Sequence, residues 1–313
     1  MTTPWTGPGP LVIGFGGNAL LPDASDPAAA TRHAEAFASA VRSVAPDDAG
    51  IVLVHGNGPQ VGAGLLRAEA AAREVTPSTL DELVAETQGS IGYLLARSLD
   101  NALPGVEVST VITQVVVDPR HPAMLSPTKP VGPFYDHATG TDLATERGWD
   151  MVEVPGRGLR RVVASPPPED VVEIGVIAAA AAPGRIVIAG GGGGIPVTRR
   201  EGRLEGVEAV IDKDRTASLI ARRLEARGLL ILTDAGHVAI GWGTPDQERI
   251  PLMAVRRARE LLDAGEFPPG SMGPKVEASA DFAETTGRPA MITSVAVLGA
   301  ALVGDDGTII ARD

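Results

Sequence analysis

The chain contains no cysteine, and this absence excludes disulfides, thiol nucleophiles and thiolate metal sites. No apolar run approaches the roughly 18 residues that a membrane-spanning helix needs. The formal net charge of −12 argues against a nucleic-acid-binding surface. The first ten residues carry neither the basic start nor the apolar run of a signal peptide. We therefore expect a soluble cytoplasmic protein that binds neither nucleic acid nor a membrane.

Lysine is nearly absent as well. Of the 27 lysine and arginine residues, only Lys129, Lys213 and Lys275 are lysine. Arginine is a wide planar fork, whereas lysine is a compact point charge on a flexible stem. A composition that favours arginine this strongly predicts that the remaining lysines lie where arginine cannot serve. The alternative is chance retention at three surface positions.

Apolar residues make up 44% of the 313 residues, which is enough for the core of one large α/β domain. Segments typical of strands and helices alternate along most of the chain, and Pro59 opens one of the helices. Further helices are expected at 27–44, 81–103, 171–182, 214–227, 254–264 and 274–285, and strands at 11–15, 51–54, 108–117, 186–189, 229–232, 238–241, 290–292 and 300–303. Repeated βα units predict a largely parallel sheet covered by helices on both faces.

Residues 118–168 interrupt this alternation. They contain many of the prolines and several glycines, and they show little helical periodicity. Long irregular segments inside a compact domain are usually functional. We therefore expect a single domain over residues 1–313, with 118–168 as a small subdomain that protrudes from it.

Three glycine-rich turns follow predicted strands: Gly16-Gly17-Asn18, Gly56-Asn57-Gly58, and Gly190 to Gly194. In parallel sheets, ligands bind at the carboxyl ends of the strands. Glycine lets the backbone N–H groups approach a ligand, and the N-terminus of a following helix favours phosphate. One such turn is weak evidence, because glycine also makes ordinary tight turns. Three turns at equivalent strand ends predict a phosphate-binding site.

Other nucleotide and metal motifs do not fit. The glycines from Gly56 to Gly62 are spaced one residue too far apart for a dinucleotide-binding fingerprint. The chain also contains neither the phosphate-binding motif GxxxxGK[ST] nor the zinc motif HExxH. The five histidines are scattered, so no zinc site is expected and no metal ligands are assigned. His55 lies in a glycine turn, where we expect it to shape the turn by hydrogen bonding to the backbone.

Two lysines lie at predicted helix starts, Lys213 within Asp212-Lys213-Asp214 and Lys275 after Gly273-Pro274. A cation there opposes the helix macrodipole, and an anion bound between the two lysines would remove the conflict. The alternative for the first segment is a solvated charge cluster in which one aspartate is the helix N-cap. Lys129, taken alone, is most simply interpreted as an exposed loop lysine.

The order of motifs along nearly the whole chain resembles the carbamate kinases of the amino acid kinase family. The similar segments are GGNALL (16–21), HGNGPQVG (55–62), TQGSIGY (87–93), TQVVVDP (113–119), PTKPVGPF (127–134), GRGLRRVVASP (156–166), GGGGIPV (191–197), GVEAVIDKD (206–214) and GSMGPK (270–275). The resemblance implies a three-layer αβα sandwich with a largely parallel central sheet, usually a homodimer. It also implies that residues 118–168 are a lid.

The resemblance assigns a role to every lysine of the chain. Lys129 would reach into the site from the lid, Lys213 and Lys275 would contact phosphates, and Asp214 would organise these lysines. The transferred phosphoryl group and its acceptor would be surrounded by Gly16, Gly17, Asn18, Gly56, Asn57 and Gly58. The nucleotide would lie against Gly191, Gly192, Thr233, Asp234, Met272 and Lys275.

The implied activity is reversible phosphoryl transfer between ATP and carbamate, which yields ADP and carbamoyl phosphate and belongs to arginine metabolism. Mg²⁺ would bridge the nucleotide phosphates with few protein ligands. Such transfer needs mainly positioning and neutralisation of negative charge, and no general base is required if the acceptor is already a carbamate anion. The alternatives are a kinase of another small carboxylate or phosphonate, or a non-catalytic nucleotide-binding regulator.

One segment departs from the family pattern. The residues from Thr233 to His237 lie where these kinases often read TDVD followed by an apolar pair, so an acidic residue is missing at Gly236. This strand end belongs to the nucleotide site of the family. Nucleotide preference is therefore less well defined by the sequence than the phosphoryl-transfer site.

Overall fold

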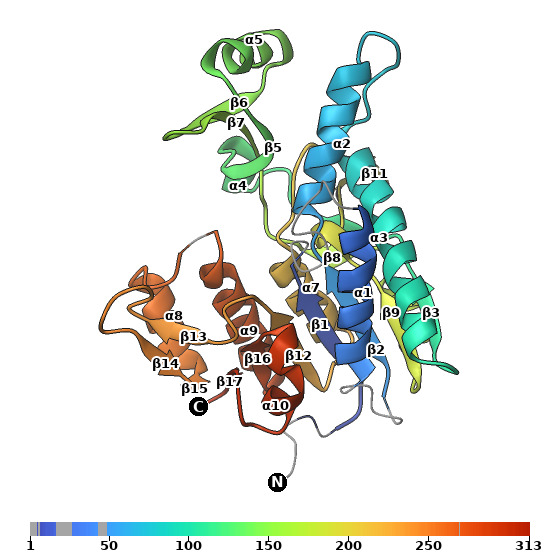
Figure 1. Cartoon of the computed structure of the whole chain (residues 1–313), viewed down its shortest axis with the longest axis vertical. Coiled ribbons are helices and arrows are strands. Elements are labelled where there is room, and N and C mark those ends of the chain that lie inside the picture. The colour runs from blue at the N-terminus through green and yellow to red at the C-terminus, as the bar shows by residue number, and fades with distance from the viewer. Residues whose placement is uncertain (1–4, 6, 17–26, 43–48, 269) are drawn as a thin grey trace.

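A computed structural model describes residues 5, 7–16, 27–42, 49–268 and 270–313. Its centre is an eight-stranded sheet with the strand order β15-β17-β16-β12-β1-β2-β9-β3 (Figure 1). In that order, the strands span Leu252–Ala254, Thr308–Ala311, Ala290–Thr293, Gly228–Leu232, Leu11–Phe15, Ile51–His55, Arg185–Ile188 and Glu107–Thr110. The strands from β16 to β3 are parallel, whereas β17 and β15 run in the opposite direction. The expected largely parallel sheet is confirmed.

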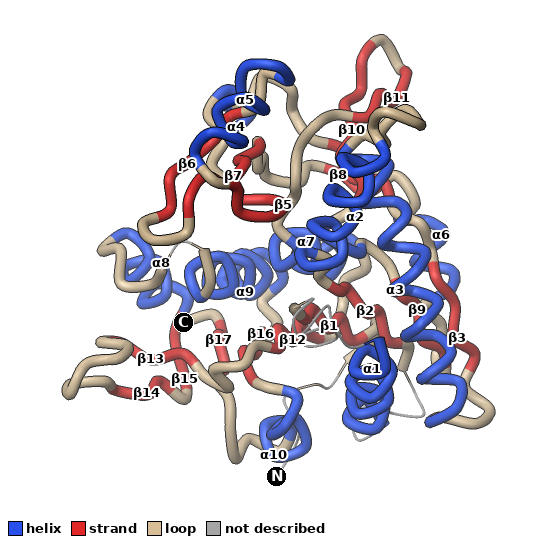
Figure 2. Tube along the Cα trace, turned by 45° about the horizontal axis from the view of Figure 1, so that its top comes forward, coloured by secondary structure: helices blue, strands red, loops and turns tan. Residues whose placement is uncertain are grey.

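Helices cover both faces of this sheet. They include α1 (Pro27–Arg42), α3 (Leu80–Ala102) and α10 (Leu298–Leu302) on one face, and α7 (Lys213–Arg223) and α9 (Met272–Thr286) on the other. Figure 2 shows the strands as a layer between α7 and α9 on one side and α1 and α10 on the other. The three-layer αβα architecture is therefore confirmed.

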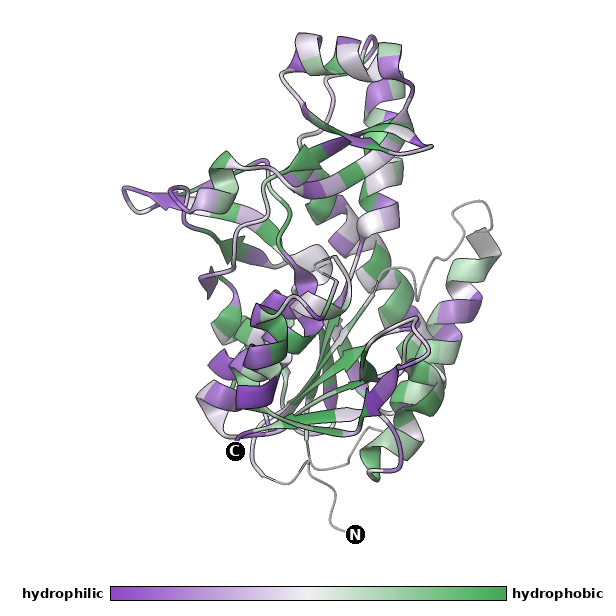
Figure 3. Cartoon of the chain, turned by 90° about the vertical axis from the view of Figure 1, so that its left-hand side faces the viewer, coloured by the Kyte–Doolittle hydropathy of each residue, from purple (hydrophilic) through white to green (hydrophobic). Residues whose placement is uncertain are grey.

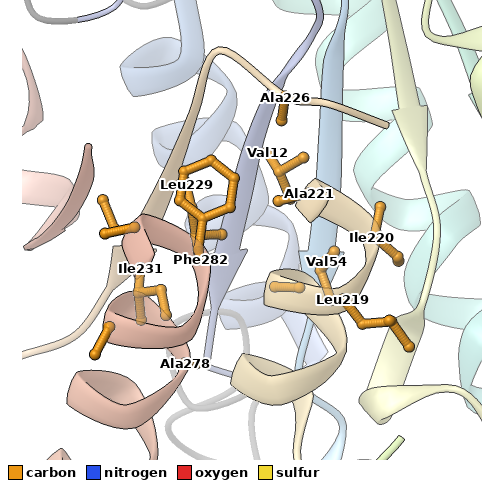
Figure 4. Close-up of a cluster of buried hydrophobic side chains, with 14 of the residues drawn as sticks. Val12, Val54, Leu219, Ile220, Ala221, Ala226, Leu229, Ile231, Ala278 and Phe282 are labelled. Atoms are coloured by element: carbon orange, nitrogen blue, oxygen red, sulfur yellow. The ribbon is translucent and has the colours of Figure 1, made fainter. Parts of the chain in front are cut away.

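Successive residues of the central strands enter two different hydrophobic cores. Val12, Val54 and Ile231 pack with α7 and α9, as Figure 4 shows, whereas Ile13 and Leu53 pack with α1 and α3. The strands at the centre of Figure 3 are accordingly coloured hydrophobic along their length. A strand covered on both faces has no solvent side, which explains the continuous apolar runs in the sequence.

Residues 122–163 stand away from this sandwich at the top of Figure 1, and we call them the extension. The extension consists of α4 (Pro122–Leu125), β5 (Lys129–Tyr135), α5 (His137–Arg147), β6 (Asp150–Val154) and β7 (Gly158–Val163), with an antiparallel sheet in the order β5-β7-β6. Its root packs on α2 (Gly58–Ala71), because Val131 and Val163 share a buried cluster with Val61 and Leu65.

Helix α5 contradicts the expectation of an irregular segment. Asp136 caps its start by accepting the Thr139 N–H at 2.9 Å, and Gly148 ends it in the left-handed conformation. Gly140 is the one buried residue of this helix. The sequence missed α5 because a helix with almost no buried face shows no apolar stripe.

Two expected strands are wrong. The run 108–117 contains two strands, β3 and β4 (Gln114–Val116), and β4 belongs to a second sheet in the order β11-β10-β4-β8. The chain moves from one sheet to the other between Thr110 and Gln114, and the β-branched residues of this run are equally compatible with one long strand. The expected strand at 300–303 is part of helix α10, because a short apolar run does not distinguish a helix from a strand.

The remaining elements are β8 (Asp170–Val171), β10 (Ile195–Arg200), β11 (Arg203–Gly206), β13 (Val238–Ile240), β14 (Glu248–Ile250), α6 (Ile174–Ala180), α8 (Val255–Asp263) and the 3₁₀ turns η2 (Gly191–Gly193) and η3 (Val295–Val297). Among the residues that the structure describes, no helix combines the length and apolar character of a membrane span.

Candidate active site

The loops that the sequence singles out meet at one edge of the central sheet. Strands β12, β1, β2 and β9 are neighbours, and their register aligns Phe15 with both His55 and Leu232. Gly16, Gly56–Gly58, Gly190–Gly194 and Thr233 therefore follow the carboxyl ends of adjacent parallel strands. The strand order reverses direction at β1, which is where open α/β sheets bind ligands. Gly17 and Asn18 lie outside the described residues.

Two of the three lysines share one carboxylate. Lys213 Nζ donates to Asp214 Oδ1 at 2.9 Å, and Lys275 Nζ donates to Asp214 Oδ2 at 2.8 Å. The Asp214 side chain is 1% exposed and each lysine is 13% exposed. Buried charges of this kind persist only when they are paired. Asp214 therefore holds two ammonium groups close together in a site from which most water is excluded.

The geometry of this pair comes from the start of α7 and the start of α9. Asp212 is the N-cap of α7 and accepts the Asp214 N–H at 2.9 Å. The first turn of α7 lies against β1 at Gly14, where an added Cβ would be 3.3 Å from the Ala217 Cβ. Lys275 lies in the first turn of α9, which packs beside α7. Both lysines therefore sit at helix starts, as predicted.

Lys129 joins the same cluster from the extension. Its Nζ lies 3.1 Å from Asp212 Oδ2, with the lysine side chain 35% exposed and the aspartate 14% exposed. All three lysines of the chain thus belong to one set of ion pairs with Asp212 and Asp214. Lys129 is not the exposed loop lysine that its local sequence suggests. With every group ionised, this cluster carries one excess positive charge.

Burial and neighbouring charges set the pKa values of the cluster. Burial alone would raise the pKa of Asp212, but Lys129 and Lys213 outweigh it and lower the pKa to about 2. Burial would lower the pKa of Lys213, but Asp214 and Asp212 raise it. Burial and the neighbouring Lys213 lower the pKa of Lys275 despite Asp214. An anion bound beside Lys275 would oppose this shift, because it favours the charged form of the lysine.

His55 shapes the turn after β2, as expected. Its Nδ1 lies 3.0 Å from the Gly56 carbonyl oxygen, and burial lowers the pKa of His55 to about 4. The imidazole is therefore neutral at pH 7 and contributes its N–H to the backbone. His55 therefore has a structural role at the start of this turn.

A buried polar network on α3 links two of the glycine turns. Asn57 Nδ2 donates to Thr87 Oγ1 at 2.8 Å, which fixes the turn after β2. Gln88 Nε2 donates to the Gly191 carbonyl oxygen at 2.9 Å, and Gln88 Oε1 accepts the Thr113 N–H at 2.7 Å. The Thr113 hydroxyl in turn accepts the Gly190 N–H at 2.9 Å. The sequence alone does not reveal these contacts, although Thr87-Gln88 and Thr113-Gln114 open two of the segments that carry the family resemblance.

Gly191 and Gly192 are glycine because the two turns press against each other. A Cβ on Gly191 would lie 2.3 Å from His55 Nε2, and one on Gly192 would lie 2.1 Å from Asn57 Nδ2. Gly192 also has a φ of 69°, where a side chain is strained. Packing between the turns therefore requires both glycines, independently of any ligand.

The other residues assigned to the nucleotide lie on neighbouring elements. Thr233 and Asp234 follow β12, and the Thr233 N–H donates to the Thr293 carbonyl oxygen at 2.8 Å. Met272 begins α9, three residues before Lys275. Gly236, the departure from the family pattern, has a φ of 72°. Its left-handed backbone favours glycine over the acidic residue expected there.

The sequence model of the amino acid kinase family matches residues 9–294. The chain is 42% identical over 313 residues to the carbamate kinase of Thermococcus kodakarensis, with 97% of this chain and 99% of that protein covered. It is also 42% identical to the carbamate kinase-like protein YahI of Escherichia coli K12, with 96% and 98% covered. The structure of the carbamate kinase from Giardia lamblia bound to AMP-PNP matches with a TM-score of 0.90 and 38% identity over 97% of this chain and 99% of that one. The chain belongs to the amino acid kinase family.

Proposed function

We propose that the chain is a carbamate kinase, which moves a phosphoryl group reversibly between ATP and carbamate. The observation that carries this proposal is the convergence of Lys129, Lys213 and Lys275 on Asp212 and Asp214, at the start of a helix that lies against Gly14 of β1 and holds the Gly193 carbonyl oxygen. Three lysines from distant parts of the sequence, in a chain with no others, form one cationic site. The similarity to the carbamate kinases of Thermococcus kodakarensis and Giardia lamblia supports the choice of acceptor.

The chemistry follows from charge and position. The transferred group carries negative charge on three oxygens, and the excess positive charge of the lysine cluster would stabilise it. Asp214 keeps two ammonium groups in place before the substrate arrives, so little reorganisation is needed during the reaction. We assign the catalytic roles to Lys129, Lys213, Lys275 and Asp214.

The acceptor needs no general base on this proposal. Carbamate is an anion at neutral pH, and its oxygen can attack phosphorus without first losing a proton. His55, the last residue of β2, is buried and neutral, and its Nδ1 donates to the backbone. We propose that the acceptor and the phosphoryl group bind at the glycine turns, that is, at Gly16, Gly17, Asn18, Gly56, Asn57 and Gly58.

The nucleotide would lie along the neighbouring strand ends. We propose contacts from Gly191, Gly192, Thr233, Asp234, Met272 and Lys275. Mg²⁺ would enter with the nucleotide as part of the substrate. The described residues contain no group of three or more His, Asp or Glu side chains that could hold a metal, and Asp212 and Asp214 are engaged by lysines. The phosphate oxygens and water would therefore supply most of its ligands.

We also propose that residues 118–168 act as a lid on a single domain and that the chain works as a homodimer in the cytoplasm. The lid is supported by Lys129, which the extension brings to the lysine cluster. Closure over the site would exclude water from the bound substrates. Light scattering on the purified protein tests the dimer.

The test of the function is ATP synthesis. Purified protein supplied with MgADP and carbamoyl phosphate should form ATP faster than carbamoyl phosphate decays without enzyme. Folded protein that makes no ATP above this control would contradict the proposal. If such a protein binds MgATP and phosphorylates another small carboxylate or a phosphonate, the acceptor assignment is wrong. If it binds the nucleotide and turns over none of them, it is a nucleotide-binding regulator.

A further inference from the structure

The extension rests on a short segment that leads directly into α7. Residues 208–212 precede Lys213 and Asp214 in sequence, and they contact the extension and the residue that follows it at several points. Ala164 forms a parallel bridge with Ala209, and its carbonyl oxygen accepts the Val210 N–H at 2.9 Å. Arg161 pairs with Glu208, and Lys129 pairs with Asp212 at 3.1 Å. The position of the extension and the start of α7 are therefore set by the same few residues.

Asp212 is the residue at which the extension contacts the start of α7. Its Oδ1 accepts the Asp214 N–H at 2.9 Å and so caps α7. Its Oδ2 accepts the Lys129 ammonium of β5 at 3.1 Å. One carboxylate thus joins the extension to the helix turn that carries Lys213 and Asp214. The local sequence of Asp212 indicates only a possible helix N-cap.

We propose that Asp212 is a positioning residue of the phosphoryl-transfer site, which holds the Lys129 ammonium beside the Lys213–Asp214–Lys275 cluster before substrate binds. This inference rests on the proposed kinase function. It adds to that function the residue that fixes the lysine of the extension and, through it, the resting position of the extension.

The physical need for such a residue is clear from the charges. Lys129 has a flexible stem and is more exposed than the other two lysines. Without Asp212, the like charges of Lys213 and Lys275 would favour a Lys129 conformation that points into solvent. An ammonium group has three donors, so Lys129 can keep Asp212 and still donate to a phosphoryl oxygen. Asp212 therefore need not release Lys129 for the reaction to proceed.

The competing interpretation is that Asp212 only caps α7. Asparagine is as good an N-cap as aspartate, because its side-chain oxygen accepts the same hydrogen bond. Asp212→Asn therefore keeps the cap and removes the charge. We expect this variant to keep the native fold and the cap but to unfold at a lower urea concentration than the wild type, because it loses the attraction of Lys129 and Lys213. It should also lose about 100-fold in kcat/KM, the cost of a misplaced catalytic group. Asp212→Ala should lose more stability, because it removes the cap as well, with a similar loss of activity.

A double-mutant cycle identifies the contact through which Asp212 acts. In a Lys129→Met background, Asp212→Asn should cost less than about twofold in kcat/KM, because both changes remove the same contact. Glu208→Gln is the matched control, since it breaks another ion pair between the extension and the same segment. Arg161 keeps its stacking on Trp149 in that variant, and kcat/KM should change less than about twofold. Additive losses from Lys129→Met and Asp212→Asn would overturn the proposal.

Hydrogen exchange tests the same contact without turnover. In ligand-free Asp212→Asn, exchange should accelerate in residues 129–135 of β5 and stay unchanged in residues 213–223 of α7, whose cap is retained. Unchanged exchange in β5 would overturn the proposal. If the wild type makes no ATP from carbamoyl phosphate, the proposed function fails, and this exchange comparison still decides whether Asp212 positions Lys129.

Discussion

The lysine cluster is built from two regions, helices α7 and α9 on one side and the extension on the other, and the fold holds these two regions with different firmness. Lys213 and Lys275 sit on helices whose inner faces lie in the main core, through residues such as Leu219 and Phe282. Lys129 sits on a strand of the extension, where α5 buries only one residue and β6 buries none. Regions with few buried apolar contacts open at low free-energy cost. The sheet side of the site is therefore built by folding, whereas the extension is held at its root, by the cluster of Val131 and Val163 on α2 and by contacts such as Lys129–Asp212.

This difference separates two tasks that a kinase must combine. A pre-arranged cationic site lowers the barrier, because its charges need not move during the reaction. A mobile wall lets substrates enter and products leave, and it can exclude water when closed. On the proposed function, α7 and α9 would perform the first task and the extension the second. Each prediction below would break or sharpen this division.

The largest effect should come from Asp214→Asn, on the sheet side. This change leaves Lys213 and Lys275 buried beside a neutral amide. We expect a loss of about 1,000-fold in kcat and roughly 3–5 kcal/mol in the free energy of unfolding. Enzyme assays and urea denaturation measure the two losses. Asp281→Asn, which weakens the half-exposed pair with Arg259, is the control and should cost less than about 1 kcal/mol with kcat unchanged. An Asp214→Asn variant as active as the wild type would show that the buried pairing is not functional.

Arginine substitutions come next and compare the two sides directly. Every Lys→Arg change keeps the charge, but the guanidinium is wider than the ammonium group. The closed surroundings of Lys213 and Lys275 should reject it, with losses of roughly 100- to 1,000-fold in kcat/KM. The more open position of Lys129 should tolerate it better, with a loss of about tenfold, or about 1.4 kcal/mol. Equal losses at all three positions, in variants with native circular dichroism, would contradict the division between a closed and an open side.

Much of the sheet side could be predicted from the sequence. Alternating apolar segments indicated most strands and helices in their order, and three glycine turns marked the carboxyl ends of neighbouring strands. The scarcity of lysine singled out all three residues of the cluster. These signals are local or compositional, so a single sequence contains them.

The rest depends on contacts between residues far apart in the chain. Gln88 holds Gly191, which lies 103 residues away, and neither residue type indicates the other. Asp212 is a good N-cap by its local sequence, and only the fold brings Lys129 to its second oxygen. Helix α5 was missed for a different reason, because a helix on the surface of the extension needs no apolar stripe. The sequence therefore predicts the layers that bury surface better than the contacts that arrange the site.

His55 and Asp212 should make the stability of the folded protein depend on pH in two different ranges. The pKa of His55 is about 4 in the folded protein, below its ordinary value of 6.5, so the unfolded chain binds the proton more readily. Its burial therefore costs stability progressively as the pH falls from 6.5 towards 4, up to about 3 kcal/mol. The pKa of Asp212 is about 2, so the stability that it contributes is full above pH 4 and is lost only as the pH falls towards 2.

Urea denaturation between pH 7 and pH 4 measures the contribution of His55. His55→Gln should flatten the dependence of the unfolding free energy on pH, whereas His137→Gln, at an exposed histidine paired with Glu153, should not. If both variants show the same pH dependence of the unfolding free energy as the wild type, groups other than His55 cause the loss of stability in acid.

The smallest effect, and the most direct test of the division, concerns exchange with solvent in the wild type. Residues 137–154 of the extension should exchange faster than residues 213–223 of α7 when no ligand is present, because α5 and β6 bury so little. Mg²⁺ with AMP-PNP and an acceptor analogue should slow exchange in the extension and leave the already protected α7 nearly unchanged. The reason is that a bound phosphate gives Lys129 a second partner and so favours the closed position of the extension. Slow exchange in both segments before ligand is added would show that the extension is as firmly built as the sheet, and that Lys129 is fixed by folding rather than by its partners.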